Sequence, residues 1–527
     1  MNDENGQPPP SDADGGQPPP SDAYDSQPHT QDFPAYQASA PAAEYPGPPA
    51  WEAPAPTGTK LRVRDRVLVT ASIVLSLSLA LVFALPAMFG NTSTNDEPET
   101  LQRVGNAAQS SADQRTGALG SDLRAGAVFL QTNDAKGNEV VAYVRRANGT
   151  LREVGRYATG GKGSGSFEDS AQGLVLGSAD GETSPTHIID KAELLFVPNA
   201  GSDTISVFRV KADRVELVSE TPSGGEKPVS ITVSHGLLYV LNSGEFDDRL
   251  IIGQTALENC THGQLPSVTG FRVTPDGSLK QIDGSTRLLT ATGESGCSQI
   301  AFSPDGKTLV AAERIAGGKK DKATGFAKGA LLTYPVYPDG TLGPVQLTEP
   351  TGNGPFAFTF TKEGALLVAQ QNGGPTNDAG GTVMTYTLNP DGTLAPVGKP
   401  VFTSGTDTCW IVVTNDERYA FTTSPLGPGR ISTLTVGKDG AMTLLHPVAS
   451  APDGRNIANS RSGTFLVDVG LSHDSRYLYA LEALAGDLYA FAVNENGTLA
   501  PIDKHHVVNL PSLVDGWQGG PFGIAAY

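Results

Sequence analysis

From residue 123 onward, hydrophobic residues gather in short runs that are separated by turn-forming residues. A typical unit is an apolar run, a turn and a second apolar run, as in Ile300–Ala312 (IAFSPDGKTLVAA) and Ile231–Asn242 (ITVSHGLLYVLN). Short apolar runs bounded by Gly, Pro, Asp or Ser predict β-strands. No long stretch after residue 123 follows the 3.6-residue period of an amphipathic helix. The pattern therefore predicts an all-β domain over residues 123–527.

A second unit alternates with the first and consists of Asp-Gly or Asn-Gly, a small residue, and Leu or Met. Asn-Gly and Asp-Gly supply the positive φ angles that a tight hairpin needs. The copies are Asn148–Leu151, Asp276–Leu279, Asp339–Leu342, Asp391–Leu394, Asp439–Met442, Asn496–Leu499 and a degenerate Lys211–Val215. Two hairpins per repeat make four antiparallel strands, which is one blade of a β-propeller. Seven markers at intervals of 48–64 residues predict seven four-stranded blades.

The two ends of this domain predict how the ring closes. The first repeat begins with Ala127–Tyr143 and lacks an innermost strand, whereas Gly520–Tyr527 is similar to the innermost strand expected at Gly354–Phe360. We expect the C-terminal strand to pair with the first blade, because closure removes exposed sheet edges. Rings of six or eight blades are the structural alternatives.

The residues before the repeats divide into four segments. Residues 1–59 are rich in Pro and carry no Lys or Arg, which predicts a disordered cytoplasmic tail. A basic flank at residues 60–66 precedes an uncharged apolar run from Val67 to Phe89, and residues 90–122 form a polar linker. A helix of this length spans a hydrocarbon core about 30 Å thick.

The charges that flank residues 67–89 predict the orientation of this span. Four basic residues precede it and three acidic residues follow it closely, so the positive-inside rule places the N-terminus in the cytoplasm. We therefore expect a single-pass protein of the cell membrane, with the propeller outside. A cleaved signal peptide is the alternative, although more than 60 residues precede the apolar run. The tail is either an extended polar segment or a polyproline ligand for a cytoplasmic partner.

The net charge and the spacing of the histidines and cysteines exclude some classes of function. The formal net charge is −19, and a strongly acidic chain repels phosphate backbones, so nucleic acid is excluded as a partner. The histidines and cysteines show no metal-ligand spacing, so we expect neither a metal nor a cofactor. Outside the cell, Cys260 and Cys297 are a candidate disulfide, and Cys409 is left as a free thiol.

Several stretches of the repeats resemble the lactonase family of seven-bladed propellers, which includes 6-phosphogluconolactonase and carboxymuconate-cyclase type proteins. They are Phe302–Lys307, Leu238–Asn242, Asn199–Phe208 and the Asp-Gly-Thr-Leu turns. The resemblance covers residues 123–527 and implies a lactone-opening activity. In phosphogluconolactonase-like members a Gly-Pro-Arg-His run stands where this chain has Gly296–Gln299, and Glu313 matches an acidic residue of the family. An amide at Gln299 cannot take up a proton as the imidazole does.

Polar residues near the predicted strand ends are the candidate ligand-facing residues, because innermost strands and their loops line the mouth of a propeller. They are Gln299, Glu313, Arg314, Gln370, Gln371, Asn372 and Glu482. A lactone-opening mechanism needs a base for water and a donor for the oxyanion, and Glu313 with Arg314 supplies those two types. Neighbours on a strand point to opposite faces, which predicts that this pair does not converge.

Two functions follow from these observations. The first is an extracytoplasmic binding module that captures a small molecule, a glycan or a protein, favoured by the missing Gly-Pro-Arg-His run and the lack of a compact acid–base cluster. The second is a lactonase-type hydrolase of an extracytoplasmic cyclic ester, favoured by the family resemblance. In the second function, Glu313 is the candidate catalytic base.

Overall fold

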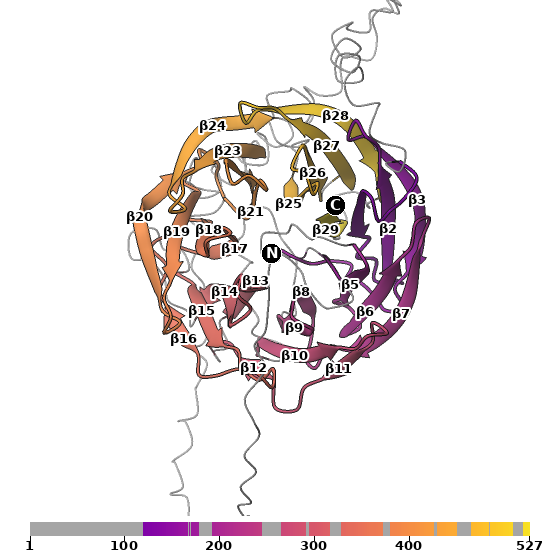
Figure 1. Ribbon diagram of the computed structural model, residues 1–527, viewed down its shortest axis with the longest axis horizontal. Coiled ribbons are helices and arrows are strands. Elements are labelled where there is room, and N and C mark those ends of the chain that lie inside the picture. Colours follow the sequence, from indigo (N-terminus) through magenta and orange to yellow (C-terminus); the bar gives the residue numbers. More distant parts are fainter. Residues whose placement is uncertain are drawn as a thin grey trace, which may run out of the picture. The chain divides into compact units, whose positions relative to one another are not determined.

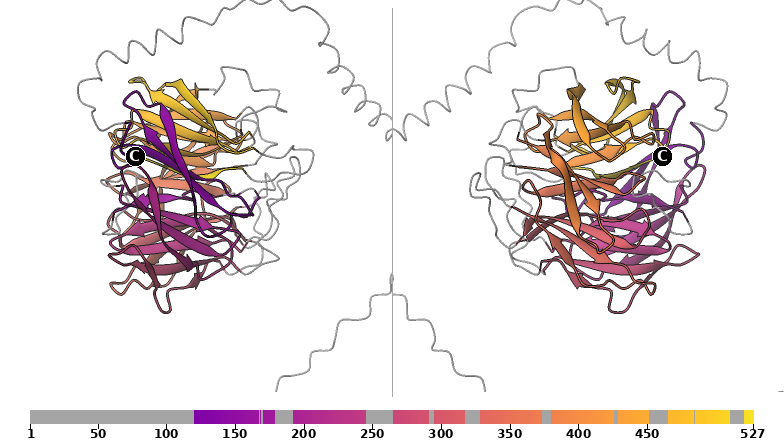
Figure 2. Two further views of the ribbon diagram at one scale, coloured as in Figure 1. Left: turned by 90° about the vertical axis from the view of Figure 1, so that its right-hand side faces the viewer. Right: turned by 60° about the vertical axis from the view of Figure 1, so that its left-hand side comes forward.

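The computed structural model describes residues 120–166, 168, 170–178, 192–244, 265–290, 295–316, 328–372, 380–425, 429–450, 465–483, 485–509 and 520–527. Within these residues, seven antiparallel sheets are arranged around a central axis, which confirms a seven-bladed propeller (Figure 1). Seen from the side, the strands run across the thickness of the disc (Figure 2). The described residues hold no helix that is long and apolar enough to span a membrane.

Each blade runs from an inner strand beside the axis to an outer strand at the rim. Blade 1 consists of β29 (Phe522–Ala526), β1 (Ala127–Gln131), β2 (Glu139–Arg145) and β3 (Leu151–Ala158). Blade 2 consists of β4 (Val175–Gly177), β5 (Leu194–Asn199), β6 (Thr204–Val210) and β7 (Val215–Pro222). Blade 3 consists of β8 (Pro228–Ser234), β9 (Leu237–Asn242), β10 (Ser267–Val273) and two short outer strands, β11 (Leu279–Gln281) and β12 (Arg287–Leu288).

The remaining four blades follow the same order. Blade 4 consists of β13 (Ser295–Phe302), β14 (Thr308–Ala316), β15 (Ala330–Pro335) and β16 (Gln346–Thr348). Blade 5 consists of β17 (Pro355–Phe360), β18 (Ala365–Gln370), β19 (Thr382–Leu388) and β20 (Leu394–Phe402). Blade 6 consists of β21 (Trp410–Val413), β22 (Tyr419–Ser424), β23 (Arg430–Val436) and β24 (Met442–Ser450). Blade 7 consists of β25 (Leu466–Leu471), β26 (Tyr477–Glu482), β27 (Asp487–Val493) and β28 (Leu499–His506).

The C-terminal strand closes the ring as predicted. β29 pairs antiparallel with β1, and Phe129 lies opposite Ala525. Blade 1 therefore takes its inner strand from the C-terminal end of the domain and its other three strands from the N-terminal end. This pairing satisfies the backbone groups of β1 that an open ring would expose.

The Asp-Gly and Asn-Gly turns lie between the third and the outer strand, and their glycines have positive φ angles, such as 85° at Gly392. These turns also join neighbouring blades, because the glycine carbonyl accepts a hydrogen bond from a hydroxyl of the preceding blade. Thr385 Oγ1 donates to Gly440 O at 2.7 Å, and Thr433 Oγ1 donates to Gly497 O at 2.8 Å. We call the end of the disc with these turns the lower end, and the opposite end the upper end.

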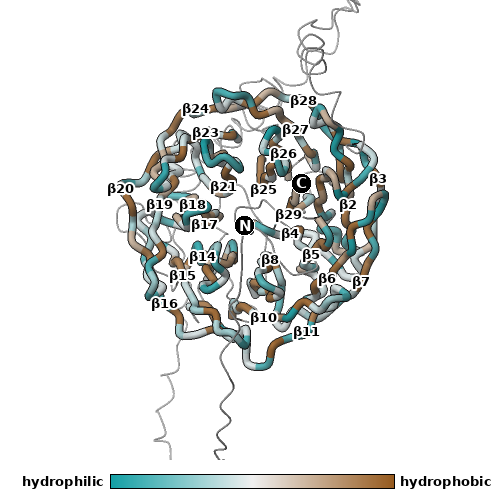
Figure 3. The backbone as a smooth tube through the Cα atoms, viewed as in Figure 1, coloured by the Kyte–Doolittle hydropathy of each residue, from teal (hydrophilic) through white to brown (hydrophobic). Residues whose placement is uncertain are grey.

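Apolar side chains fill the spaces between adjacent blades. Every residue of β5 and β26 is buried, whereas Leu151 is the only buried residue of the outer strand β3. Hydrophobic and hydrophilic positions are interspersed along the strands (Figure 3). Between blades 3 and 4, the Tyr239 and Phe302 rings meet edge to face with centroids 5.9 Å apart. The tail, the basic flank, the span from Val67 to Phe89 and the linker up to residue 119 lie outside the described residues, so these four predictions are untested.

Candidate functional site

One position of the repeat carries a buried polar residue in every blade. It lies near the upper end of the second strand, where that strand pairs with the beginning of the third strand, and it is the last residue of the second strand in every blade except blade 4. The residues are Gln131, Asn199, Asn242, Glu313, Gln370, Ser424 and Glu482, and each is at most 4% exposed. Three of the predicted ligand-facing residues, Glu313, Gln370 and Glu482, therefore occupy structurally equivalent positions. We call the full set the polar ring.

Glu313 is fully buried in the polar ring and faces blade 3. Its Oε1 accepts a hydrogen bond from Thr290 Oγ1 at 2.8 Å, and its Oε2 accepts one from Thr290 N at 3.2 Å. Burial raises the pKa of Glu313 to about 7, although both hydrogen bonds favour the charged form. A carboxyl with this pKa exchanges protons near neutrality, but none of its surface is accessible to solvent.

Arg314 follows Glu313 on β14 and is 4% exposed. Its guanidinium carbon lies 3.0 Å from the point where a side chain on Gly296 would begin, so this glycine leaves space for the arginine. The Glu313 carboxylate instead contacts Thr290. Arg314 thus packs against Gly296 while Glu313 contacts Thr290, which agrees with the expected divergence of neighbours on a strand.

Gln299 links two inner strands. Its Nε2 donates to Phe358 O at 2.7 Å, and its Oε1 accepts from Phe358 N at 2.9 Å. The side-chain amide thus replaces a missing backbone pairing between β13 and β17. This contact explains why an amide suits the position where the resembling family has an imidazole.

The other predicted residues hold loops at the upper end. Gln370 accepts a hydrogen bond from Thr382 Oγ1 at 3.1 Å, and Asn372 accepts one from Asn353 N at 2.7 Å. Glu482 accepts hydrogen bonds from the backbone N–H groups of Phe465, at 2.6 Å, and Ala485. These three side chains lie in blades 5 and 7 and do not meet Glu313.

A segment of the chain crosses the axis and closes it. Residues 170–174, which lead into β4, form hydrogen bonds with blades 1, 3, 4 and 6, and we call them the axial segment. Written from donor to acceptor, the hydrogen bonds are Trp410 Nε1 to Ser170 O, Ser170 Oγ to Val229 O, Ala171 N to Ser298 O, Ile231 N to Gln172 O, and Gln131 Nε2 to Gly173 O. The cavity against it measures only about 20 Å³, which is space for about one water molecule.

Asp468 lies in this axial cavity, on the inner strand of blade 7. Its carboxylate accepts hydrogen bonds from Val469 N at 3.0 Å and from Ile524 N at 3.3 Å. Burial raises the pKa of Asp468 to about 7 against the effect of these two bonds. We did not predict this residue. A single Asp in the otherwise apolar run Leu466–Leu471 is the sequence signal that points to it.

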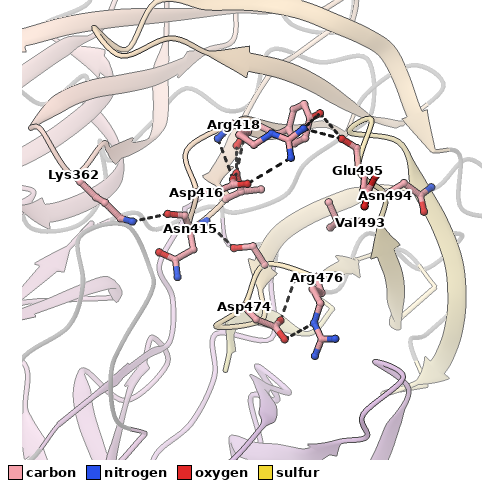
Figure 4. Close-up of a pocket in the computed structure, with 12 residues that line it drawn as sticks. Lys362, Asn415, Asp416, Arg418, Asp474, Arg476, Val493, Asn494 and Glu495 are labelled. Carbon is pink, nitrogen blue, oxygen red and sulfur yellow. Dashed lines mark hydrogen bonds and ion pairs between the residues drawn. The ribbon is translucent and has the colours of Figure 1, made fainter. Parts of the chain in front are cut away.

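A larger hollow lies at the lower end between blades 6 and 7 and measures about 400 Å³ (Figure 4). We call it the lower groove. Its charged lining residues are Lys362, Asp416, Arg418, Asp474, Arg476 and Glu495. The two aspartates belong to turns in which a hydroxyl donates to the carboxylate, from Thr414 to Asp416 and from Ser472 to Asp474.

The charged side chains of the lower groove include ion-paired groups and groups that are exposed to solvent. Arg476 Nε contacts Asp474 Oδ2 at 2.6 Å, while Arg418 NH1 lies 4.0 Å from Asp416 Oδ2. Burial acts to raise the pKa of Asp474, but hydrogen bonds from Ser472 and Arg476 outweigh it and lower that pKa. The side chains of Arg418 and Arg476 are 57% and 54% exposed, so both guanidinium groups are accessible to a ligand.

The cysteines and the possible metal ligands can be followed only within the described residues. Cys297 is buried in β13, but Cys260 lies outside the described residues, so their disulfide is untested. Cys409 is also buried, and its sulfur accepts a hydrogen bond from Gln371 Nε2 at 3.6 Å. Among the described residues, no three His, Cys, Asp or Glu side chains are grouped closely enough to hold a metal ion.

Comparison with known proteins supports the resemblance found in the sequence. Residues 265–376 match a family model described as lactonase, 7-bladed beta-propeller. The chain is a seven-bladed β-propeller that is similar to the lactonase family over these residues. The matched part of the propeller runs from blade 3 into blade 5 and includes Glu313 and Gln299. The curated proteins include no match to the chain.

Solved structures are similar to this propeller over most of its length. A putative 6-phosphogluconolactonase from Bacteroides fragilis is 15% identical, with 73% of this chain and 96% of that chain covered and a TM-score of 0.50. The periplasmic gluconolactonase of Pseudomonas aeruginosa is 16% identical, with coverage of 76% and 98% and a TM-score of 0.51. A protein from Lactobacillus plantarum is 15% identical, with coverage of 76% and 99% and a TM-score of 0.52. Identities this low show the fold alone.

Proposed function

We propose that this propeller is a binding module and that the lower groove is its ligand site. The observation that carries the proposal is the contrast between two hollows. The axial cavity, where a propeller of this shape would hold a substrate, has space for about one water molecule. The lower groove has about 400 Å³, a volume within the range of small-ligand sites, and the side chains of its two arginines are more than half exposed.

The lining of the lower groove favours a hydroxyl-rich ligand, which makes a glycan the proposed ligand class. Three cationic and three anionic side chains line the groove, so the lining has no net charge that would select an acidic or a basic ligand. Sugar hydroxyls both donate and accept hydrogen bonds, and they match a mixture of guanidinium, amide and carboxylate groups. Asn415 and Asn494 add two amides to this mixture.

The test is a calorimetric titration of the purified full-length chain with soluble glycan fragments of cell envelopes. We expect saturable binding that is weakened at least tenfold by Arg476→Ala combined with Glu495→Ala, because both residues line the groove. Lys438→Ala is the matched control, since this exposed lysine belongs to the turn of blade 6 and does not line the groove. Equal affinity in the groove variant and the control would contradict the proposal.

A second candidate function is lactone hydrolysis, favoured by the family match over residues 265–376. Glu313 lies in this range, and its pKa of about 7 suits a general base at neutral pH. The test is the pH change during incubation of the full-length chain with glucono-δ-lactone and simple γ-lactones. Turnover above buffer that Glu313→Gln abolishes would favour the hydrolase, whereas a folded, inactive chain favours the binding module.

The proposed cellular context is display on the outer face of the cell membrane. It rests on the apolar run from Val67 to Phe89 and on the basic residues that precede it. Protease added to intact cells should then remove the propeller and spare the N-terminal tail. Protection of the propeller in intact cells, with cleavage only after lysis, would place it on the inner side.

A further inference from the structure

A single carboxylate lies among the inner strands that surround the axis. The seven inner strands (β29, β4, β8, β13, β17, β21 and β25) and the axial segment are described throughout, and together they contain one Asp or Glu and no Lys, Arg or His. That residue is Asp468, which is 6% exposed and lines the axial cavity. Buried carboxylates are usually paired with a cation, because removing the charge from water is costly. The structure shows no such cation for Asp468, so the ionised form is held at a cost.

Asp468 binds the strand that closes the ring. Its Oδ2 accepts a hydrogen bond from Ile524 N of β29 at 3.3 Å. Beside this bond the pairing of β29 with β1 skips Gly523, which has a φ of 62°. One extra residue in a strand of an antiparallel pair is a β-bulge, and bulges interrupt the ladder locally. The carboxylate therefore contacts β29 at the point where its pairing with β1 is weakest.

The axial segment packs against the same bulge. A side chain on Gly523 would begin 2.6 Å from the carbonyl carbon of Gly173, and one on Gly173 would begin 2.8 Å from the Phe522 ring. Only glycine at both positions allows this approach of two backbones. The axial segment, β29 and β25 thus meet at one contact beside the cavity. We call its residues, Asp468, Gly173, Gly523 and Ile524, the axial clasp.

The axial clasp excludes most of the water that an ionised carboxylate binds. The cavity has space for about one water molecule. Burial raises the pKa of Asp468 from its ordinary value of 3.8 to about 7, against the effect of the backbone hydrogen bonds from Ile524 and Val469. In an opened clasp, water hydrates the carboxylate and the pKa returns toward its ordinary value. Loss of the proton therefore favours the open state over the closed one.

The titratable groups that flank the clasp have other positions or partners. The rings of His473, after β25, and Tyr527, after β29, contact each other with centroids 5.5 Å apart. Glu482 of β26 accepts a hydrogen bond from Phe465 N, and Glu168, before the axial segment, lies 3.7 Å from the Lys227 ammonium. None of these groups lines the axial cavity, and no charged side chain contributes to the pKa shift of Asp468.

We propose that the axial clasp is a proton-controlled gate, which stays closed while Asp468 carries a proton and opens when that proton leaves to solvent. In the open state, β29 and the axial segment separate from β25 and water reaches the carboxylate. Opening should become about tenfold more frequent for each pH unit between about pH 4 and 7. The gate controls access to the axis and does not rest on the ligand site proposed at the lower groove.

Hydrogen–deuterium exchange of the full-length chain tests the gate, because it detects openings that are rarely populated. Mass spectrometry follows the peptides that cover β29 and the axial segment, and protection factors correct for the intrinsic pH dependence of exchange. We expect both protection factors to fall about tenfold for each pH unit between pH 5 and 7 and to level off above about pH 8. Constant protection from pH 5 to 8 would overturn the proposal. No ligand is needed, so the result is independent of glycan binding.

Variants separate the gate from unfolding of the whole ring. In Asp468→Asn the amide cannot ionise, so both protection factors should be independent of pH, whereas Asp213→Asn, an exposed control, should behave as the parent chain does. Gly523→Ala forces a side chain against Gly173, so it should lower protection of β29 at least tenfold at every pH and keep the pH dependence. Unchanged protection in Gly523→Ala would contradict the gate. Amides of β19 should stay better protected than β29 at each pH, and equal values would assign the effect to global unfolding and overturn the proposal.

Discussion

Individual buried polar residues have two different roles in this propeller. Gln299 hydrogen-bonds to both backbone groups of Phe358 and thereby joins two inner strands. Asp468 lies in the axial cavity with a pKa raised by burial to about 7. The polar groups of Gln299 are matched by hydrogen-bond partners, whereas burial destabilises the charged form of Asp468. Replacing each of them should therefore have opposite consequences near neutral pH.

We expect Gln299→Leu to destabilise the chain by about 2–4 kcal/mol, because Phe358 N–H and C=O are left buried without this partner. Chemical unfolding of the purified chain measures the change. Gln346→Leu is the control, since the same substitution at this exposed position of β16 should change stability by less than about 0.5 kcal/mol. A stable Gln299→Leu variant with lost ligand binding would instead support the ligand-facing role predicted from the sequence.

The pH dependence of stability should reveal Asp468. Its pKa is about 7 in the folded chain and near 3.8 in the unfolded chain, so the folded chain holds this proton more tightly. The parent chain should then lose stability as pH rises from about 4 to 7, by on the order of a few kcal/mol from this group. Asp468→Asn carries no such proton and should gain stability relative to the parent over that range. A constant difference between the two proteins from pH 4 to 8 would contradict this assignment.

At the scale of elements, the Asp-Gly-Thr-Leu turn joins blades as well as strands. Its aspartate or asparagine accepts hydrogen bonds from the following Thr, as Asp391 does from Thr393 N at 3.0 Å and Thr393 Oγ1 at 2.7 Å. These bonds lower the pKa of Asp391. The turn glycine then presents its carbonyl to the preceding blade, where Thr333 donates to Gly392 O. The same contact occurs at five of the six Asp-Gly or Asn-Gly turns, with Tyr239 and Tyr479 as the donors to Gly340 O and Gly149 O.

This role predicts a cost for removing one hydroxyl between blades. Thr433→Val keeps the shape of the side chain but removes the donor to Gly497 O, so we expect a loss of about 1–2 kcal/mol. Thr435→Val is the matched control on the same strand, since Thr435 is partly exposed. Thermal unfolding of both variants measures the difference. Equal melting temperatures would show that this contact between blades 6 and 7 adds nothing to stability.

For the whole molecule, closure depends on strand pairing between the two ends of the domain. Val128 of β1 lies opposite Ala526 of β29. A disulfide between Val128→Cys and Ala526→Cys should raise the free energy of unfolding by about 2–4 kcal/mol, because it restricts a very long loop of the unfolded chain. Melting temperatures with and without reductant measure this gain. The shifted pair Val128→Cys and Ala525→Cys should not crosslink, because those side chains point to opposite faces.

The sequence by itself determined the architecture of residues 123–527. Strand patterning and the seven turn markers are local properties, because hairpin register and positive φ angles depend on a few neighbouring residues. The similarity of Gly520–Tyr527 to other inner strands was sufficient to predict ring closure, and the pairing of β29 with β1 confirms it. The likeness of Phe302–Lys307 to the lactonase family is likewise supported by the match over residues 265–376.

Only the tertiary structure decided what the candidate site residues contact. Their positions at strand ends were predictable, but burial and partners depend on residues of other blades, as with Gln299 and Phe358, which are 59 residues apart. The axial segment carries no special motif, and its effect comes from hydrogen bonds with four blades that meet at the axis. The raised pKa of Asp468 has the same origin, since desolvation is a property of the assembled ring and not of the strand that carries the residue.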